Sequence, residues 1–100
     1  MKTLVVEDNV MTRGMIVDLL AEMGHQVVGQ AENGEEAVRI FREQRPELVL
    51  LDLIMPGKTG MEVLVEIKAI DPAVKVVMVT AVRQDLMSRQ LLEKGALAVL

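Results

Sequence analysis

The sequence predicts an α/β domain built on a mainly parallel β-sheet with helices on both faces. Five short aliphatic and β-branched runs alternate along the chain with four segments of helical periodicity. Such strict alternation requires crossover connections between parallel strands. The length of 100 residues leaves room for one compact domain. We therefore expect a single domain over residues 1–100.

The predicted strands are the runs richest in valine, leucine and isoleucine. The third run is continuously apolar and the fourth nearly so, which is typical of central strands buried on both faces. The five runs lie at residues 3–6, 26–29, 48–51, 74–79 and 97–100.

The predicted helices are the segments whose apolar residues recur at spacings of three and four. Asn33 is a favourable N-cap for the second helix, and Pro46 ends that helix. The four helices are expected at about residues 11–23, 34–45, 63–70 and 84–94, ending at Gly24, Pro46, Asp71-Pro72 and Gly95.

Composition excludes several classes of function. Hydrophobic residues make up 51% of the chain and charged residues 26%, as in globular proteins. The net charge of −4 argues against a surface that binds nucleic acid. There are no cysteines, so disulfides, thiolate zinc sites and cysteine nucleophiles are excluded. His25 is the only histidine, which excludes a histidine-rich metal site.

The same composition predicts location and core. The N-terminus lacks a signal-peptide pattern, and no apolar run approaches the ~18 residues of a membrane span. We therefore expect a cytoplasmic domain without membrane contact. Phe41 is the single aromatic residue, whereas methionines number eight. We expect an aliphatic core in which Phe41 and the methionines are buried.

Polar side chains follow three of the predicted strands. Glu7-Asp8 follow the first, Asp52 ends the third and Thr80 ends the fourth. Parallel strands bring these residues to one edge of the sheet, where ligands bind in open α/β folds. Two carboxylates ~5 Å apart repel by roughly 3 kcal/mol at an effective dielectric constant near 20. A cation or a shared proton is needed, and carboxylate oxygens suit magnesium and phosphoryl chemistry.

The alternative for Glu7-Asp8-Asn9 is a simple helix-entry cap, and Thr80 alone is uninformative. Asp52 is harder to explain structurally, because an acid directly after a buried strand is costly without a role. The joint placement at three strand ends favours the functional interpretation.

Taken together, Glu7-Asp8-Asn9, the stretch from Asp52 to Gly57 with Gly60, Thr80-Ala81 and Gly95-Ala96 resemble the receiver domain of two-component response regulators. The resemblance spans essentially the whole chain. It implies a doubly wound, flavodoxin-like five-stranded sheet in the order 2-1-3-4-5. It also implies a signalling switch rather than an enzyme with a diffusible product.

The resemblance assigns a role to each site residue. Asp52 is similar to the phosphoacceptor, which takes a phosphoryl group from a sensor histidine kinase or a phosphotransfer protein. Asp8, Asp52 and the backbone carbonyl of Ile54 are implied magnesium ligands, and Glu7 acts through a metal-bound water. Thr80 is the implied switch hydroxyl. A downstream effector or a fused output domain is the implied second partner.

Three departures concern the C-terminus. The family's lysine after the fifth strand would come after Leu100, the family's aromatic switch position aligns with Val99, and the last helix is missing from this chain. We therefore expect a C-terminally incomplete receiver domain. One apolar face of its sheet is then covered mainly by the first helix, so the chain is either marginally stable alone or buries that face in a homodimer.

Two other functions are compatible with parts of the sequence. Residues 52–59 read D-x-x-x-x-G-K-T, a P-loop pattern in which Asp52 replaces the first glycine. An aspartate there aims a carboxylate at the phosphates, so we interpret Lys58 as a solvated loop charge. The other rival is a receiver-like protein-interaction module that works without phosphorylation. His25 is expected to be a surface residue.

Overall fold

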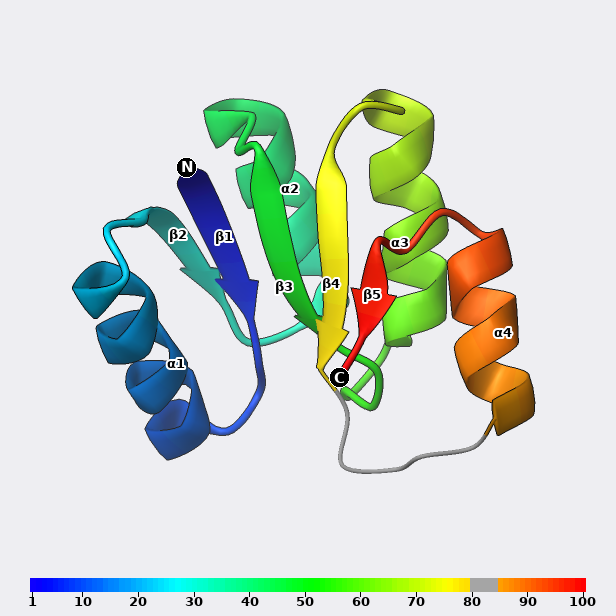
Figure 1. Cartoon of the computed structure of the whole chain (residues 1–100), viewed down its shortest axis with the longest axis horizontal. Coiled ribbons are helices and arrows are strands. Elements are labelled where there is room, and N and C mark those ends of the chain that lie inside the picture. The colour runs from blue at the N-terminus through cyan, green and yellow to red at the C-terminus, as the bar shows by residue number, and fades with distance from the viewer. Residues whose placement is uncertain (80–84) are drawn as a thin grey trace.

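The computed structural model describes residues 1–79 and 85–100. Five parallel strands form one sheet in the order β2-β1-β3-β4-β5, which confirms the predicted order (Figure 1). The strands are β1 (Lys2–Val6), β2 (Gln26–Ala31), β3 (Leu48–Asp52), β4 (Lys75–Val79) and β5 (Ala98–Val99). The helices are α1 (Val10–Glu22), α2 (Gly34–Gln44), α3 (Gly60–Ile70) and α4 (Asp85–Glu93).

Three helices begin at polar capping side chains. Asn9 Oδ1 accepts the Thr12 N–H at the start of α1, at 2.9 Å. Asn33 does the same for α2, and Thr59 Oγ1 accepts the Glu62 N–H at the start of α3. Each cap satisfies an N–H that has no partner within its helix, so these residues set where the helices start.

One hydrophobic core lies between the sheet and the helices α2, α3 and α4, which cover one of its faces. Alternate residues of the central strands point into it, as the two-residue period of a strand requires. Phe41 of α2 is fully buried there, which confirms its predicted place. Further members of this core are Leu4, Val6, Val49, Leu51, Leu64, Ile67, Val76, Met78 and Leu91.

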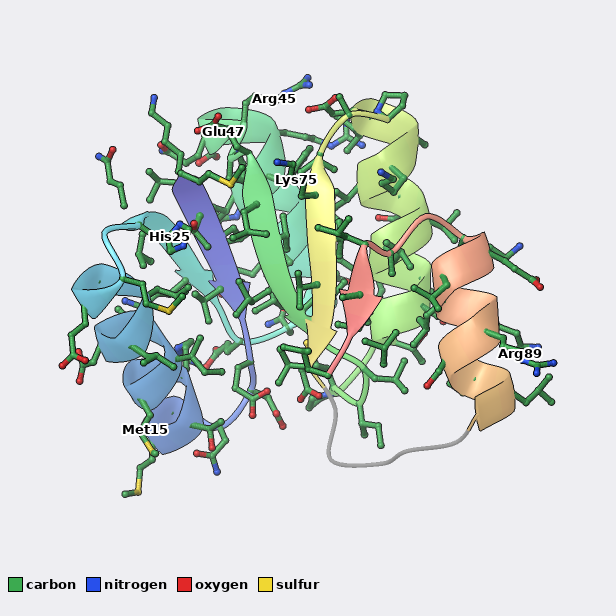
Figure 2. All side chains as sticks on the ribbon, in the orientation of Figure 1. Met15, His25, Arg45, Glu47, Lys75 and Arg89 are labelled. Carbon is green, nitrogen blue, oxygen red and sulfur yellow. The ribbon has the colours of Figure 1, made fainter. Side chains whose placement is uncertain are left out.

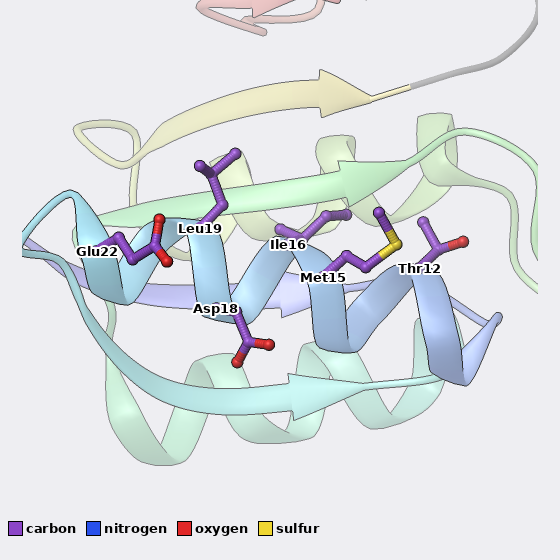
Figure 3. Close-up of a pocket in the computed structure, with 6 residues that line it drawn as sticks. All are labelled: Thr12, Met15, Ile16, Asp18, Leu19 and Glu22. Carbon is purple, nitrogen blue, oxygen red and sulfur yellow. The ribbon is translucent and has the colours of Figure 1, made fainter.

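The other face carries α1, which packs chiefly against β1 and β2. Leu50, Val77 and Val79 of β3 and β4 are only partly buried. A groove of about 560 Å³ runs along α1, lined by residues of that helix (Figure 3). The lining residues are Thr12, Met15, Ile16, Asp18, Leu19 and Glu22.

The expectation that the methionines are buried is wrong for α1. Met55 and Met78 lie in the core, but Met11 and Met15 of α1, and Met23 at its C-cap, are exposed by 64% or more. Figure 2 shows Met15 projecting away from the molecule. The apolar stripe of α1 is broader than the surface that the helix presents to the sheet, so only part of it is covered.

His25 also differs from expectation. It lies between α1 and β2 and is half-buried rather than a free surface residue (Figure 2). Its Nδ1 is shielded from solvent and has no hydrogen-bond partner within the part of the chain described.

After β3 the chain turns back sharply before α3 begins. The Gly60 N–H donates to the Leu53 carbonyl at 2.8 Å. A Cβ atom on Gly60 would overlap the Asp52 carbonyl oxygen and lie 2.7 Å from Leu53 Cα. Gly60 is the first residue of α3, and the close approach of backbone to backbone requires glycine there.

We predict opposite effects of alanine at two helical glycines. Gly60→Ala should lower the free energy of unfolding by about 1–3 kcal/mol, because backbone must shift to admit the methyl group. Gly14→Ala in α1, where the added Cβ would meet nothing within 4 Å beyond its chain neighbours and the backbone of its own helix, should raise it by about 0.5–1 kcal/mol. Urea unfolding of both variants measures the difference, and equal stabilisation would contradict the described packing of Gly60.

Candidate metal centre

Glu7, Asp8 and Asp52 meet at the carboxyl edge of the sheet. Val6 pairs with Leu51 in the register of β1 and β3, so the residues that follow them are neighbours. One carboxylate oxygen from each of the three acids lies within 4.8 Å of the other two. Glu7 and Asp52 are partly buried and Asp8 is exposed. The structure therefore brings together three of the predicted site residues.

The loop that carries Glu7 and Asp8 is held by its backbone. The Glu7 N–H donates to the Ala31 carbonyl at 3.0 Å. The Glu7 carbonyl accepts a hydrogen bond from Arg13 Nη1 at 2.8 Å. Because Asn9 caps α1 directly after Asp8, both acids are fixed between a strand end and a helix start.

The predicted fourth contributor, Ile54, follows Asp52 in the β3–α3 loop. Its N–H lies 3.4 Å from Asp52 Oδ1, so its backbone is adjacent to the acid cluster. The Ile54 side chain is 62% exposed and takes no part in the core.

Burial and the neighbouring carboxylates together shift the pKa of Glu7 upward. Burial, and then a hydrogen bond with Asp52 and repulsion by Asp52 and Asp8, raise the pKa of Glu7 from 4.5 to about 7. Burial and like charges both disfavour the ionised form of a carboxyl group. Without a cation, the cluster therefore lowers its own repulsion by retaining a proton.

The donor set suits a hard divalent cation. Magnesium prefers oxygen ligands and is commonly held by one or two carboxylates together with water. Asp8 and Asp52 offer such carboxylates, and Glu7 contributes a third carboxylate oxygen within 4.8 Å of theirs. A cation would relieve the repulsion by Asp52 and Asp8 that, together with burial, raises the Glu7 pKa.

The predictions for Thr80 and Lys58 have different outcomes. Thr80 lies outside the described residues. Lys58 is not the solvated loop charge that was expected, because its Nζ bonds both carboxylate oxygens of Glu66 at 2.7 and 2.9 Å. This pairing also directs the lysine toward α3, away from the role it would have in a P-loop. Arg13 was missed by the sequence reasoning, since nothing in its spacing identifies a loop carbonyl as its partner.

The sequence-family model of the response regulator receiver domain matches residues 3–100 of the chain. The chain belongs to this family. Among its relatives, the chemotaxis protein CheY of Listeria monocytogenes is 41% identical over 96 residues, covering 96% of this chain and 81% of that protein. The response regulator GacA of Pseudomonas syringae is 43% identical over 96 residues, covering 95% of this chain and 45% of GacA.

A solved structure agrees with nearly all of this chain. The CheX–CheY complex of Borrelia burgdorferi with BeF3 and Mg2+ contains a chain with a TM-score of 0.96 and 28% identity. The match covers 99% of this receiver domain and 75% of that chain.

Among the described helices, none is long and apolar enough to cross a membrane.

The Glu7 pKa predicts a pH dependence of stability in the metal-free receiver domain. Because the folded state holds this proton more tightly than the unfolded chain, the stabilisation is complete below pH ~4.5 and is lost as pH rises through about 7. The free energy of unfolding of the wild type relative to Glu7→Gln should therefore fall between pH 5 and pH 8. Urea unfolding with a chelator present measures it.

Glu22→Gln, which changes an exposed acid of α1, is the matched control. Its difference from the wild type should be flat over the same range. A flat difference for Glu7→Gln as well would contradict the described cluster.

Proposed function

We propose that this receiver domain is a phosphorylation-activated switch in which Asp52 accepts a phosphoryl group from the phosphohistidine of a sensor histidine kinase or a phosphotransfer protein. The observation that carries the proposal is the meeting of Glu7, Asp8 and Asp52 within 4.8 Å at the carboxyl edge of the sheet. A signalling role of this kind places the domain in the cytoplasm and yields no diffusible product.

Asp52 is suited to act as the nucleophile. It ends a central strand, is partly buried, and has its carboxylate beside the N–H of Ile54. In the transfer, a carboxylate oxygen forms a bond to phosphorus while the phosphorus–nitrogen bond of phosphohistidine breaks, its electron pair remaining on the imidazole. Such a reaction depends mainly on positioning and on neutralisation of charge.

Asp8, Asp52 and the backbone carbonyl of Ile54 would hold Mg2+, with Glu7 acting through a water ligand. When bound, the ion would offset the negative charge of the phosphoryl group. The CheY structure from Borrelia, which contains BeF3 and Mg2+, supports this choice of metal and of reaction.

Thr80 is proposed as the hydroxyl that donates to the phosphoryl group and carries the change outward. An effector protein or a fused output domain would receive the signal. The response regulator GacA, of which this chain spans less than half, has the additional length that a fused domain would need. The alternative, an interaction module that works without phosphorylation, keeps the same fold but needs no acceptor.

The acceptor assignment predicts the response to beryllofluoride, a mimic of the aspartyl phosphate. Adding it with Mg2+ should shift the amide resonances near Asp52 and Thr80 in the wild type and leave Asp52→Asn unchanged. Asp18→Asn, an exposed aspartate of α1, is the matched control and should respond as the wild type does. No shift in the wild type would favour the phosphorylation-independent module.

The metal assignment predicts that Asp8→Asn weakens Mg2+ binding on the order of tenfold, about 1.4 kcal/mol. The metal-free variant should be at least as stable as the wild type, because one source of carboxylate repulsion is removed. Calorimetric titration and thermal unfolding measure the two effects. A sharp loss of metal-free stability would instead indicate a structural role for Asp8.

A further inference from the structure

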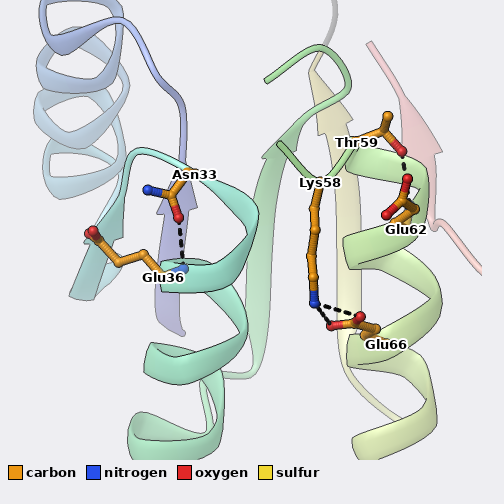
Figure 4. A network of polar contacts seen from close by, with 6 residues as sticks. All are labelled: Asn33, Glu36, Lys58, Thr59, Glu62 and Glu66. Atoms are coloured by element: carbon orange, nitrogen blue, oxygen red, sulfur yellow. Dashed lines mark hydrogen bonds and ion pairs between the residues drawn. The ribbon is translucent and has the colours of Figure 1, made fainter. Parts of the chain in front are cut away.

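The β3–α3 loop, residues 53–59, is tied to α3 by a lysine at its far end. Lys58 Nζ makes bonds of 2.7 and 2.9 Å to the two carboxylate oxygens of Glu66. Figure 4 shows the Lys58 side chain extending along the space between α2 and α3 to reach Glu66. The two side chains are only 30% and 40% exposed, so solvent screens this pair less than a fully exposed one.

The aliphatic part of Lys58 also fits against the start of α2. A Cβ atom on Gly34 would lie 2.6 Å from Lys58 Cβ and 2.8 Å from Val63 Cγ2. Glycine at this position therefore allows the loop to approach α2 closely. Lys58 thus joins the loop to α2 by packing and to α3 by charge.

The opposite end of the loop belongs to the acid cluster. The Ile54 N–H lies 3.4 Å from Asp52 Oδ1, and the Gly60 N–H bonds the Leu53 carbonyl. A displacement of the loop at Lys58 would be passed to Ile54 through a short segment whose other end is fixed at Asp52.

We propose that Lys58 is a positioning residue of the metal and acceptor site, which holds the β3–α3 loop through Glu66 so that the Ile54 backbone stays at Asp52. This inference rests on the proposed function for the identity of the site. Lys58 touches neither the metal nor the phosphoryl group in this role.

Mg2+ affinity separates positioning from simple electrostatics. Lys58→Met keeps the packing of the stem but removes a positive charge, so electrostatics alone would tighten Mg2+ binding. Glu66→Gln removes a negative charge, so electrostatics alone would weaken it. Positioning instead predicts weaker binding in both variants, by about three- to tenfold, and near wild-type binding in Lys58→Arg, whose guanidinium can bond both Glu66 oxygens.

The exposed pair Arg39–Glu43 on α2, with N···O 3.7 Å, is the matched control. Arg39→Met and Glu43→Gln should leave Mg2+ affinity within twofold of the wild type. Tighter binding in Lys58→Met, or unchanged binding in both Lys58→Met and Glu66→Gln, would overturn the proposal.

Hydrogen exchange of the metal-free domain provides a readout that does not depend on the proposed function. The Gly60 amide should exchange faster in Lys58→Met and Glu66→Gln, but not in Arg39→Met, because its partner Leu53 lies in the same loop. Unchanged exchange would overturn the inference about the loop. If the wild type fails to bind Mg2+, the proposed function fails, while the exchange measurement still decides whether Lys58 holds the loop.

Discussion

The parallel pairing of β1 with β3 is the constraint on which the rest of the site depends. Val6 and Leu51 are opposite each other and fully buried, and each such side chain contributes about 1.5–3 kcal/mol on burial. The residues that follow them are acids, whose pairwise repulsion is also only a few kcal/mol. Because the burial of many side chains outweighs one such repulsion, the sheet holds the carboxylates together. They could separate only if β1 and β3 came apart and the core were disrupted.

The repulsion between the clustered carboxylates is reduced within the cluster itself. Glu7 retains a proton to about pH 7, and a cation could replace that proton. Residues outside the cluster hold the two loops that carry the acids. Arg13 of α1 bonds the loop after β1, and Gly60 and Lys58 hold the loop after β3. The site thus combines negative charge, which favours binding of a cation, with loops whose backbone is held in place by contacts outside the cluster.

The two faces of the sheet differ in how completely they are covered. The face under α2, α3 and α4 forms one continuous core, whereas α1 covers chiefly the β2–β1 side of the other face. Methionines follow this asymmetry: Met78 fills the core, while Met11 and Met15 of α1 are exposed. The phosphoryl chemistry proposed here uses neither face, since its residues lie at the edge where the strands end.

Sequence alone determined the alternation of strands and helices, the strand ends that carry acids, and the family, because hydrophobic periodicity and strand-end residues are local properties. It placed Phe41 in the core and Glu7, Asp8 and Asp52 at one edge. Tertiary structure decided what depends on distant contacts. Lys58 forms an ion pair because α3 brings Glu66 within reach of it. Arg13 donates to the carbonyl of Glu7 in the loop after β1. The methionines of α1 remain exposed because only part of the apolar surface of this helix packs against the sheet.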